Sequence, residues 1–382
     1  LEAYRVSVEW GRVVPRRGEV DAAALEHYRR LAAALEAAGI RPIVCLHHFT
    51  NPRWLHDECP GGWASAGAVD RFVEFAEVVA GALPQARDWV PFNEPMVYTG
   101  GAHLAGMFPP GRLGVFRPAR DFLGGPVRHV ALAHRRVHAL LKRRLPGCRV
   151  GIAQSVNVVE PLRPGRDDEA ARLWDELFHW ALLDALVLAR MDADLDGERE
   201  TVLGEGPTLD FVGVNYYTRG FVRRVPLVLR PVHGAFLFPD MCMTPPLGLV
   251  WKLLTAGRAT LPHDDLLREV YPDGLRRVLE ATHRRYGLPL LVTENGVPDE
   301  SGLLRGPHLL GHLEAVRAAI ADGVPVEGYL YWSLVDNWEW GSFRPRFGLW
   351  RVDFERGHRR TLTEGGALYR DVIARHRASR GG

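Results

Sequence analysis

Short β-branched or aromatic runs alternate with longer amphipathic segments along the chain, and this alternation limits the possible folds more than any other feature. It is typical of β/α units arranged around a parallel sheet. Seven runs are predicted to be strands, over residues 4–9, 42–47, 89–93, 150–155, 211–216, 290–294 and 329–333. Apolar residues recur at intervals of three and four in six stretches, which predicts helices over 22–38, 69–82, 127–145, 167–187, 264–286 and 309–321.

The joints between helices and strands predict the overall architecture. Gly39 and Gly287 stand where helices are expected to end, shortly before the next strand. Seven parallel strands are one short of a closed eight-stranded barrel, and an open edge in such a sheet is a liability. The sequence therefore predicts an α/β fold, a (β/α)8 TIM barrel whose first strand is absent from this chain and would precede Leu1. Residues 1–382 are interpreted as one N-terminally incomplete barrel domain.

Two long segments rich in glycine and proline, 99–126 and 219–262, follow predicted strand ends. We expect both to be irregular loops. They would lie at the C-terminal face of the barrel, where barrel enzymes place their active sites.

Charge and cysteine usage narrow the class of protein. Lys and Arg total 48 against 46 Asp and Glu, so the net charge of +2 gives no reason to expect nucleic acid or an anionic membrane as partner. Four scattered cysteines show neither zinc-ligand spacing nor a disulfide framework. No apolar run reaches the roughly 20 residues that span a bilayer. We expect a cytoplasmic protein, with a signal upstream of Leu1 left open and the oligomeric state unknown.

Two glutamates end strand-like runs and are followed by residues that interrupt a strand. Glu94 ends WVPFNE before Pro95, and Glu294 ends LLVTE before Asn295 and Gly296. Hydrolysis of a glycosidic bond requires one carboxylic acid to protonate the leaving oxygen and a second carboxylate to attack or to activate water. Either glutamate alone is equally well explained by an ion pair or a helix N-cap. Their joint occurrence favours a catalytic pair.

Six motifs resemble those of glycoside hydrolase family 1, the β-glucosidases and their relatives. In order they are YRVSVEW, LHHFTNPRWL, FNEP, FVGVNYYT, VTENG and YWSLVDNWEW, and they span residue 4 to about residue 354. The resemblance implies a retaining mechanism with Glu94 as acid/base and Glu294 as nucleophile, their carboxyl groups about 5 Å apart. It implies neither a metal nor an organic cofactor.

The resemblance also implies roles for the residues around this pair. Arg5 and Tyr217 match the residues that support the nucleophile, since an adjacent guanidinium favours the charged form of a carboxyl group. The implied sugar-binding residues are His48, Asn93, Asn215, Trp332, Glu339 and Trp340. Structural roles stay open for Arg5, as a buried ion pair, and for His48. His47 is expected to face the barrel wall.

The last motif bears on the substrate. Family members that act on 6-phosphorylated sugars replace the residue at position 339, whereas the carboxylate of Glu339 would repel a phosphate. Phe347 either closes the sugar pocket near the 6-position or packs under the last loop, and Trp338 is interpreted as a packing residue. The apolar segment 236–254 is either a helix packed on the barrel or an apolar surface for an aglycone or a partner.

The function predicted from these residues is a retaining exo-β-glycosidase that hydrolyses unphosphorylated β-glucosides or β-galactosides through a covalent glycosyl-enzyme intermediate. The predicted partner is a small-molecule β-glycoside substrate, and one option is that its aglycone is apolar. Two alternatives remain: a barrel that binds a sugar or another small molecule with weak or no turnover, and a transglycosidase that uses the same residues.

Overall fold

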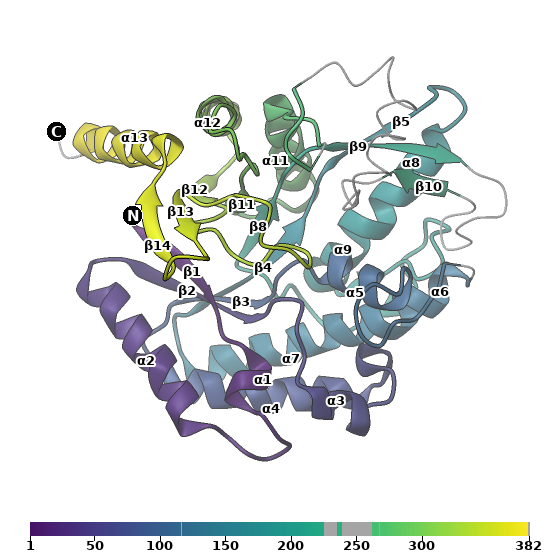
Figure 1. Cartoon of the computed structure of the whole chain (residues 1–382). Helices are drawn as coiled ribbons and strands as arrows, with labels where there is room; N and C mark the ends of the chain where they lie inside the picture. Colours follow the sequence, from purple (N-terminus) through teal and green to yellow (C-terminus); the bar gives the residue numbers. More distant parts are fainter. Residues whose placement is uncertain (116, 225–234, 239–261, 267, 381–382) are drawn as a thin grey trace.

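The computed structural model describes residues 1–382 except 116, 225–234, 239–261, 267 and 381–382 (Figure 1). Its central sheet has seven parallel strands in the order β1–β2–β3–β4–β8–β11–β12. Their bounds are Ala3–Ser7, Arg41–His47, Asp88–Phe92, Arg149–Ser155, Phe211–Asn215, Leu290–Asn295 and Val326–Tyr331. All seven predicted strands are confirmed, with small shifts at their ends.

Helices surround this sheet (Figure 1). The main ones are α2 (Ala22–Ala37), α4 (Gly67–Ala82), α7 (Arg128–Arg144), α11 (Pro272–Tyr286) and α12 (Arg305–Ala321). The predicted helix over 167–187 consists of three consecutive segments, α8 (Asp168–Asp175), η3 (Glu176–Trp180) and α9 (Ala181–Val187). Gly287 follows α11 with a φ of 66°, the left-handed conformation that ends a helix without a Cβ clash.

The helix prediction over 264–286 is wrong for its first part, residues 264–271. The helix begins at Pro272, because a proline fits the first helical turn and forces the preceding Tyr271 out of the helical region. Upstream, the Asp264 carboxylate accepts hydrogen bonds from the N–H groups of Leu266 and Arg268, which forms a local turn instead.

The two predicted irregular segments are also partly wrong. Residues 99–126 contain the end of α5 (Pro95–His103), α6 (Ala119–Phe122) and most of η2 (Leu123–Val127). In 219–262, β9 (Arg219–Arg224) and β10 (Ala235–Phe238) join β5 (Val158–Pro161) in a three-stranded sheet. Residues 239–254 of the apolar segment lie outside the described residues, so both interpretations of it stay predictions.

The remaining elements complete the described chain. They are α1 (Trp10–Val13), α3 (Arg53–Glu58), η1 (Gly62–Ala64), β6 (Arg190–Met191), β7 (Thr201–Val202), β13 (Trp350–Asp353), β14 (Arg359–Leu362) and α13 (Glu364–Arg380). The N-terminus lies beside α13 (Figure 1), where Arg377 Nη2 donates a hydrogen bond to the carbonyl of Leu1 at 2.9 Å. Among the described residues, no helix has the length and apolarity needed to cross a membrane.

The inside of the barrel is filled by side chains from alternate strand positions. Ile43, Cys45, Val90, Ala153, Phe211 and Leu291 form one buried cluster. Phe211 needs the space above Gly151, where a Cβ would approach its ring to 2.4 Å. The barrel is therefore a packed core that supports a site at one end.

The sheet is open between β12 and β1. These two strands approach each other without pairing. Every residue of β1 is partly exposed, and β12 is partly or fully exposed throughout, whereas all of β3, β8 and β11 is buried. The prediction of a barrel that lacks one strand is confirmed.

Candidate active site

The predicted site residues gather at the C-terminal ends of the parallel strands. Arg5 lies in β1, His48 follows β2, and Asn93 and Glu94 follow β3. Asn215 and Tyr217 lie at the end of β8 and just beyond it, Glu294 lies in β11, and Trp332 follows β12 ahead of Glu339 and Trp340. The structure thus brings residues that are far apart in the sequence to one end of the barrel.

Glu94 is held by the backbone on both sides of its strand. Its N–H donates to the carbonyl of Ala153 at 2.7 Å, and the N–H of Asn93 donates to the carbonyl of His47 at 2.8 Å. Glu94 adopts φ 44° and ψ 51°, a left-handed conformation that costs a non-glycine residue about 1–2 kcal/mol. This conformation lets the chain turn from β3 into α5, with Pro95 at the start of the helix.

The Glu94 carboxyl group is buried, with 6% of the residue exposed. The Asn215 amide donates to its Oε1 at 3.1 Å. Burial, and then the charge of Glu294, raise the pKa of Glu94 from 4.5 to about 8, although the Asn215 hydrogen bond, Arg5 and Ser155 oppose this rise. Glu94 is therefore protonated at neutral pH, as a general acid must be.

Glu294 is buried between two donors. Its Oε1 forms an ion pair with Arg5 Nη2, and its Oε2 accepts a hydrogen bond of 2.7 Å from Tyr217 Oη. Burial, followed by the charges of Glu294 and Glu94, raises the pKa of Tyr217 well above 10, so its phenol keeps the proton it donates. Burial alone would lower the pKa of Arg5, but the Glu294 carboxylate raises it overall. These contacts hold both oxygens of the Glu294 carboxyl group in place.

Neutral polar side chains lie at the ends of the three neighbouring strands β1, β2 and β3. His48 Nε2 lies 3.1 Å from Asn93 Nδ2, which donates to it, and His48 Nδ1 lies 3.1 Å from Ser7 Oγ. Burial, and then the Arg5 guanidinium, lower the pKa of His48 to about 3, so the imidazole is neutral. His47 points the other way and packs among Trp63, Phe92 and other rings, as expected.

The segment after β12 brings an indole and a carboxyl group together. Trp332 Nε1 donates to Glu339 Oε1 at 2.9 Å, which is the polar partner that this carboxyl group needs between two indoles. Burial raises the pKa of Glu339 to about 7, against the effect of this hydrogen bond. The Trp340 ring packs on Phe49 and Phe108, with centroids 5.4 and 5.8 Å apart.

The glycine that follows the strand end at Glu294, Gly296, has a steric reason. A Cβ on Gly296 would lie 1.8 Å from the carbonyl oxygen of Trp332, so only glycine allows the loop after β12 to pass this close. Asn295 adds a second tie, because its backbone carbonyl accepts from the Trp332 N–H at 3.0 Å. These two contacts fix the position of the Trp332 backbone relative to strand β11, which carries Glu294.

Several residues at the site were not predicted. The Thr293 hydroxyl donates to Asn215 Oδ1 at 2.6 Å and so orients the amide that contacts Glu94. Ser7 positions His48, and the Arg268 guanidinium lies 4.8 Å from the Tyr217 ring centroid. Only Ser7 had a signal in the sequence: it stands two residues after Arg5 and therefore shares its face of the strand.

Two aromatic residues of the last motif have different environments. Phe347 is buried, 6.2 Å from the Tyr217 ring and under the Arg268 guanidinium, so it packs behind the tyrosine that contacts Glu294. Trp338 is 59% exposed and contacts Phe343, so its interpretation as a packing residue is wrong.

One group of described side chains has ligand atoms close enough for a cation. The carboxylate oxygens of Asp192, Asp194, Asp196 and Glu200 lie within 4.8 Å of one another, and three of the four residues are exposed. These residues join β6 to β7 on the way from α9 to β8, which is the N-terminal face of the sheet. They lie at the opposite end from Glu94 and Glu294.

A neutral buried carboxyl group, an ion-paired carboxylate and an indole beside them at the C-terminal face of a TIM barrel define a glycoside hydrolase that works with two carboxyl groups. Comparison with known proteins identifies the family. The model of glycosyl hydrolase family 1 matches residues 1–378. The chain belongs to this family and is a retaining β-glycosidase.

The individual relatives include glycosidases and one glycosyltransferase. A β-galactosidase of Sulfolobus acidocaldarius is 32% identical over 93% of the chain and 77% of its own length. The chloroplastic galactolipid galactosyltransferase SFR2 of Arabidopsis thaliana is 30% identical over 100% of the chain, which spans 56% of that protein. A solved β-glycosidase from Pyrococcus horikoshii has a TM-score of 0.82 and 30% identity, with 97% of this chain and 80% of that one covered.

Proposed function

We propose that this β-glycosidase removes a terminal glucose or galactose, with Glu94 as acid/base and Glu294 as nucleophile. The observation that carries the assignment is the difference between the two carboxyl groups. Glu94 is buried with a pKa of about 8, whereas Glu294 is held by Arg5 and Tyr217. Two carboxyl groups whose environments differ in this way serve as acid and nucleophile.

In the first step Glu94 gives its proton to the glycosidic oxygen while a Glu294 oxygen attacks C1. The aglycone leaves as an alcohol, and a glycosyl ester of Glu294 forms. This ester carries no charge, so one of the two causes that raise the pKa of Glu94 disappears. Glu94 can then take a proton from a water molecule that attacks C1, which frees the sugar with retained configuration and restores both carboxyl groups.

The surrounding residues have separate tasks in this proposal. Asn93 contacts the sugar 2-hydroxyl, and Asn215 holds the Glu94 carboxyl group. The Trp332 indole offers an apolar face to the pyranose ring. Glu339, Trp340 and His48 bind the other hydroxyls. A carboxyl group with a pKa near 7 can both donate to and accept from a sugar hydroxyl, and its charged form repels a phosphate, which supports an unphosphorylated substrate.

Transglycosylation remains the second candidate, because water and an alcohol acceptor compete for the same glycosyl ester. The likeness to a galactosyltransferase motivates this candidate without favouring it. We further propose that residues 1–382 act as one domain, which the family match over 1–378 supports. The cytoplasmic location stays a prediction that rests on the cysteine pattern.

The roles are tested with azide as an external nucleophile on activated p-nitrophenyl β-glucoside and β-galactoside. Glu94→Ala should be rescued by azide with a β-glycosyl azide as product, since azide attacks the glycosyl ester. Glu294→Ala should give the α-glycosyl azide, since azide replaces the missing carboxylate. Glu364→Gln, a change to an exposed carboxylate at the start of α13, serves as control and should behave as wild type. Rescue with the opposite anomers would reverse the assignment.

A further inference from the structure

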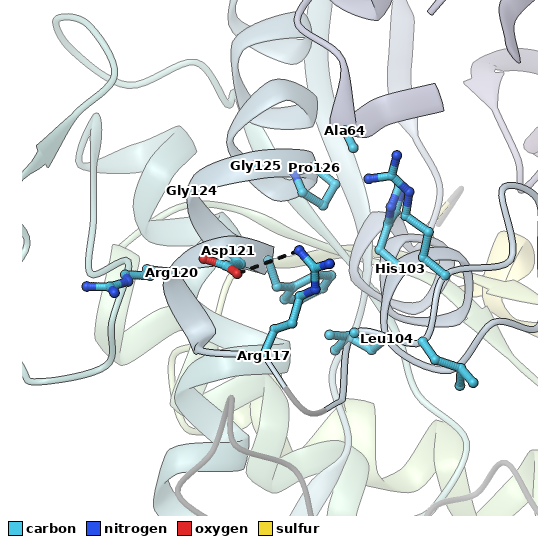
Figure 2. Close-up of a pocket in the computed structure, with 13 residues that line it drawn as sticks. Ala64, His103, Leu104, Arg117, Arg120, Asp121, Gly124, Gly125 and Pro126 are labelled. Carbon is cyan, nitrogen blue, oxygen red and sulfur yellow. Dashed lines mark ion pairs between the residues drawn. The ribbon is translucent and has the colours of Figure 1, made fainter. Parts of the chain in front are cut away.

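A second pocket lies beside α5, away from the two catalytic carboxyl groups (Figure 2). Its volume is about 790 Å³, in the range of small-molecule sites. Helix α5 begins next to Glu94 and ends at His103, which lines this pocket. A helix of nine residues is about 13 Å long, so the pocket is separate from the sugar site but within reach of an extended aglycone.

Positive charge dominates the lining. The lining contains three arginines, Arg112, Arg117 and Arg120, and a single acidic residue, Asp121, whose carboxylate lies 4.0 Å from Arg117 Nη1. Within the part of the chain that the structure describes, the Arg112 side chain has no ion pair or hydrogen bond. Its guanidinium lies over Gly61, where a Cβ would come within 2.2 Å of Nη2, so a glycine makes room for it.

His103 provides a hydrogen-bonding group in the same wall. The residue is 6% exposed, and its Nε2 is buried without a hydrogen-bond partner among the described residues. Burial, and then the charges of Arg112 and His56, lower the pKa of His103 to about 4, so the ring is neutral and one ring nitrogen carries a proton. A buried polar atom without a partner is costly in a protein that offers it no ligand.

The floor of the pocket leaves the backbone accessible. Gly124 and Gly125 line it, and a Cβ on either residue would meet open space. In Figure 2 the Arg117 side chain extends between Asp121 and Leu104, whereas Arg120 extends away from the others. Arg112, Arg117 and His103 are therefore the groups that can converge on one ligand.

We propose that this pocket binds an oxyanion of the phosphate, sulfate or carboxylate class between Arg112, Arg117 and His103. Guanidinium groups match the geometry of such anions and bind them through charge-assisted hydrogen bonds. The anion takes the place of Asp121 as the partner of Arg117. Its source is either a free ion or an acidic group on the aglycone of the substrate.

The same loop connects this pocket to the sugar site. Phe108, between His103 and Arg112, stacks on Phe49 at 5.8 Å and on Tyr98 at 6.2 Å, and it contacts Trp340 of the sugar site. The segment that carries Arg112 therefore also contacts the rings around the sugar site. The proposal concerns binding and does not depend on turnover.

Calorimetric titration with sodium sulfate at constant low ionic strength tests the proposal. The wild type should show saturable binding, and the double variant Arg112→Gln/Arg117→Gln should bind at least tenfold more weakly. Asp121→Asn should bind severalfold more tightly, because it removes the competing carboxylate. Arg120→Gln, which removes the same charge from the same segment, should stay within about twofold of wild type, since its side chain extends away.

Two results would overturn the proposal: no saturable heat with the wild type, or equal affinities for the wild type and the double variant. His103→Phe gives an independent check with an expected loss of binding, and thermal melts of all variants verify folding. A second titration distinguishes the sources. Sulfate that competes only with a carboxyphenyl β-glucoside, and not with the neutral phenyl analogue, identifies an acidic aglycone. Sulfate that binds without competition identifies a free ion.

Discussion

The strands β2, β3, β4, β8 and β11, here called the interior strands, differ sharply from the edge strands β1 and β12. Interior strands have neighbours on both sides and are buried along almost their whole length. The edge strands have one neighbour each and are partly exposed throughout. One barrel therefore carries site residues both on strands that are paired on two sides and on strands that are paired on one side.

The site is divided along this line. Asn215 belongs to an interior strand, Asn93 and Glu94 directly follow one, and the Asn215 amide donates to both of them. Arg5 and Trp332, in contrast, belong to the two edge strands or directly follow them. The proposed acid/base, Glu94, therefore lies in the better-paired part of the sheet, while the ion pair of Glu294 and the position of Trp332 depend on the open part.

The largest effect is expected from Arg5→Met, which removes the contribution of an edge strand to the ion pair of Glu294. It leaves Glu294 buried without its ion pair, a loss of about 3–5 kcal/mol in comparable buried pairs. If this loss falls on the transition state, kcat/KM should decrease by about 10²- to 5 × 10³-fold. Arg285→Met, which breaks the ion pairs of Arg285 with Glu176 and Asp184 on the outside of the barrel, is the control and should leave kcat/KM unchanged. A value within twofold of wild type for Arg5→Met would remove Arg5 from the site.

The next effect concerns stability at the interior strands. The pKa of Glu94 is about 8 in the folded chain against an ordinary 4.5, so the folded state keeps a proton that the unfolded state loses between these pH values. Stability therefore falls as pH rises from about 4.5 to about 8, by about 3–5 kcal/mol. Glu94→Gln removes this titration. In urea unfolding we expect the free energy of unfolding of the variant to exceed that of wild type clearly at pH 8 and hardly at pH 4.5. An equal difference at both pH values would refute the environment described for Glu94.

Hydrogen exchange compares the two sets of strands directly. Amides in β1 and β12 should exchange about 10- to 100-fold faster than those in β3 and β8, because local opening is easier where pairing is one-sided. Mass spectrometry of peptides from these four strands measures the difference. Equal protection would mean that the open edge carries no energetic cost.

The smallest effect is expected from Trp332→Phe, which keeps an apolar face but removes the N–H that donates to Glu339. A lost hydrogen bond to a partly charged group costs about 1–2 kcal/mol, so kcat/KM should fall by about tenfold. The pKa of Glu339 should rise above about 7, because that N–H favours the charged form. Trp338→Phe, at an exposed position in the same segment, should change kcat/KM by less than twofold, and similar losses in both variants would refute a specific role for Trp332.

The sequence predicted the interior strands better than the segments outside the sheet. Strands buried on both faces form continuous apolar runs, so 89–93 and 211–216 could be predicted closely. The helix predicted from 264 failed at Pro272, and Trp338 was misjudged because an aromatic residue in a loop has no periodicity to show its burial. The positions of Glu94 and Glu294 at the ends of strands could be predicted from the sequence.

The contacts that distinguish the two glutamates could not be predicted. The hydrogen bonds from Thr293 to Asn215 and from Asn215 to Glu94 depend on the register that pairs Asn215 with Glu294. Such register is set by packing across three strands and not by any local pattern. The pocket beside α5 could not be predicted for a similar reason. His103 and Arg112 both line it only because the intervening loop turns back.

The central claim is that Glu294 forms the covalent bond to the sugar, and trapping tests it most directly. Incubation with a 2-deoxy-2-fluoro-β-glucoside that carries a good leaving group should slow hydrolysis of the ester and leave one sugar per chain. Peptide mass spectrometry should find that sugar on Glu294, with no labelling in Glu294→Gln and normal labelling in Glu364→Gln. A sugar on another residue, or rapid turnover without a trapped ester in an active preparation, would contradict the assignment.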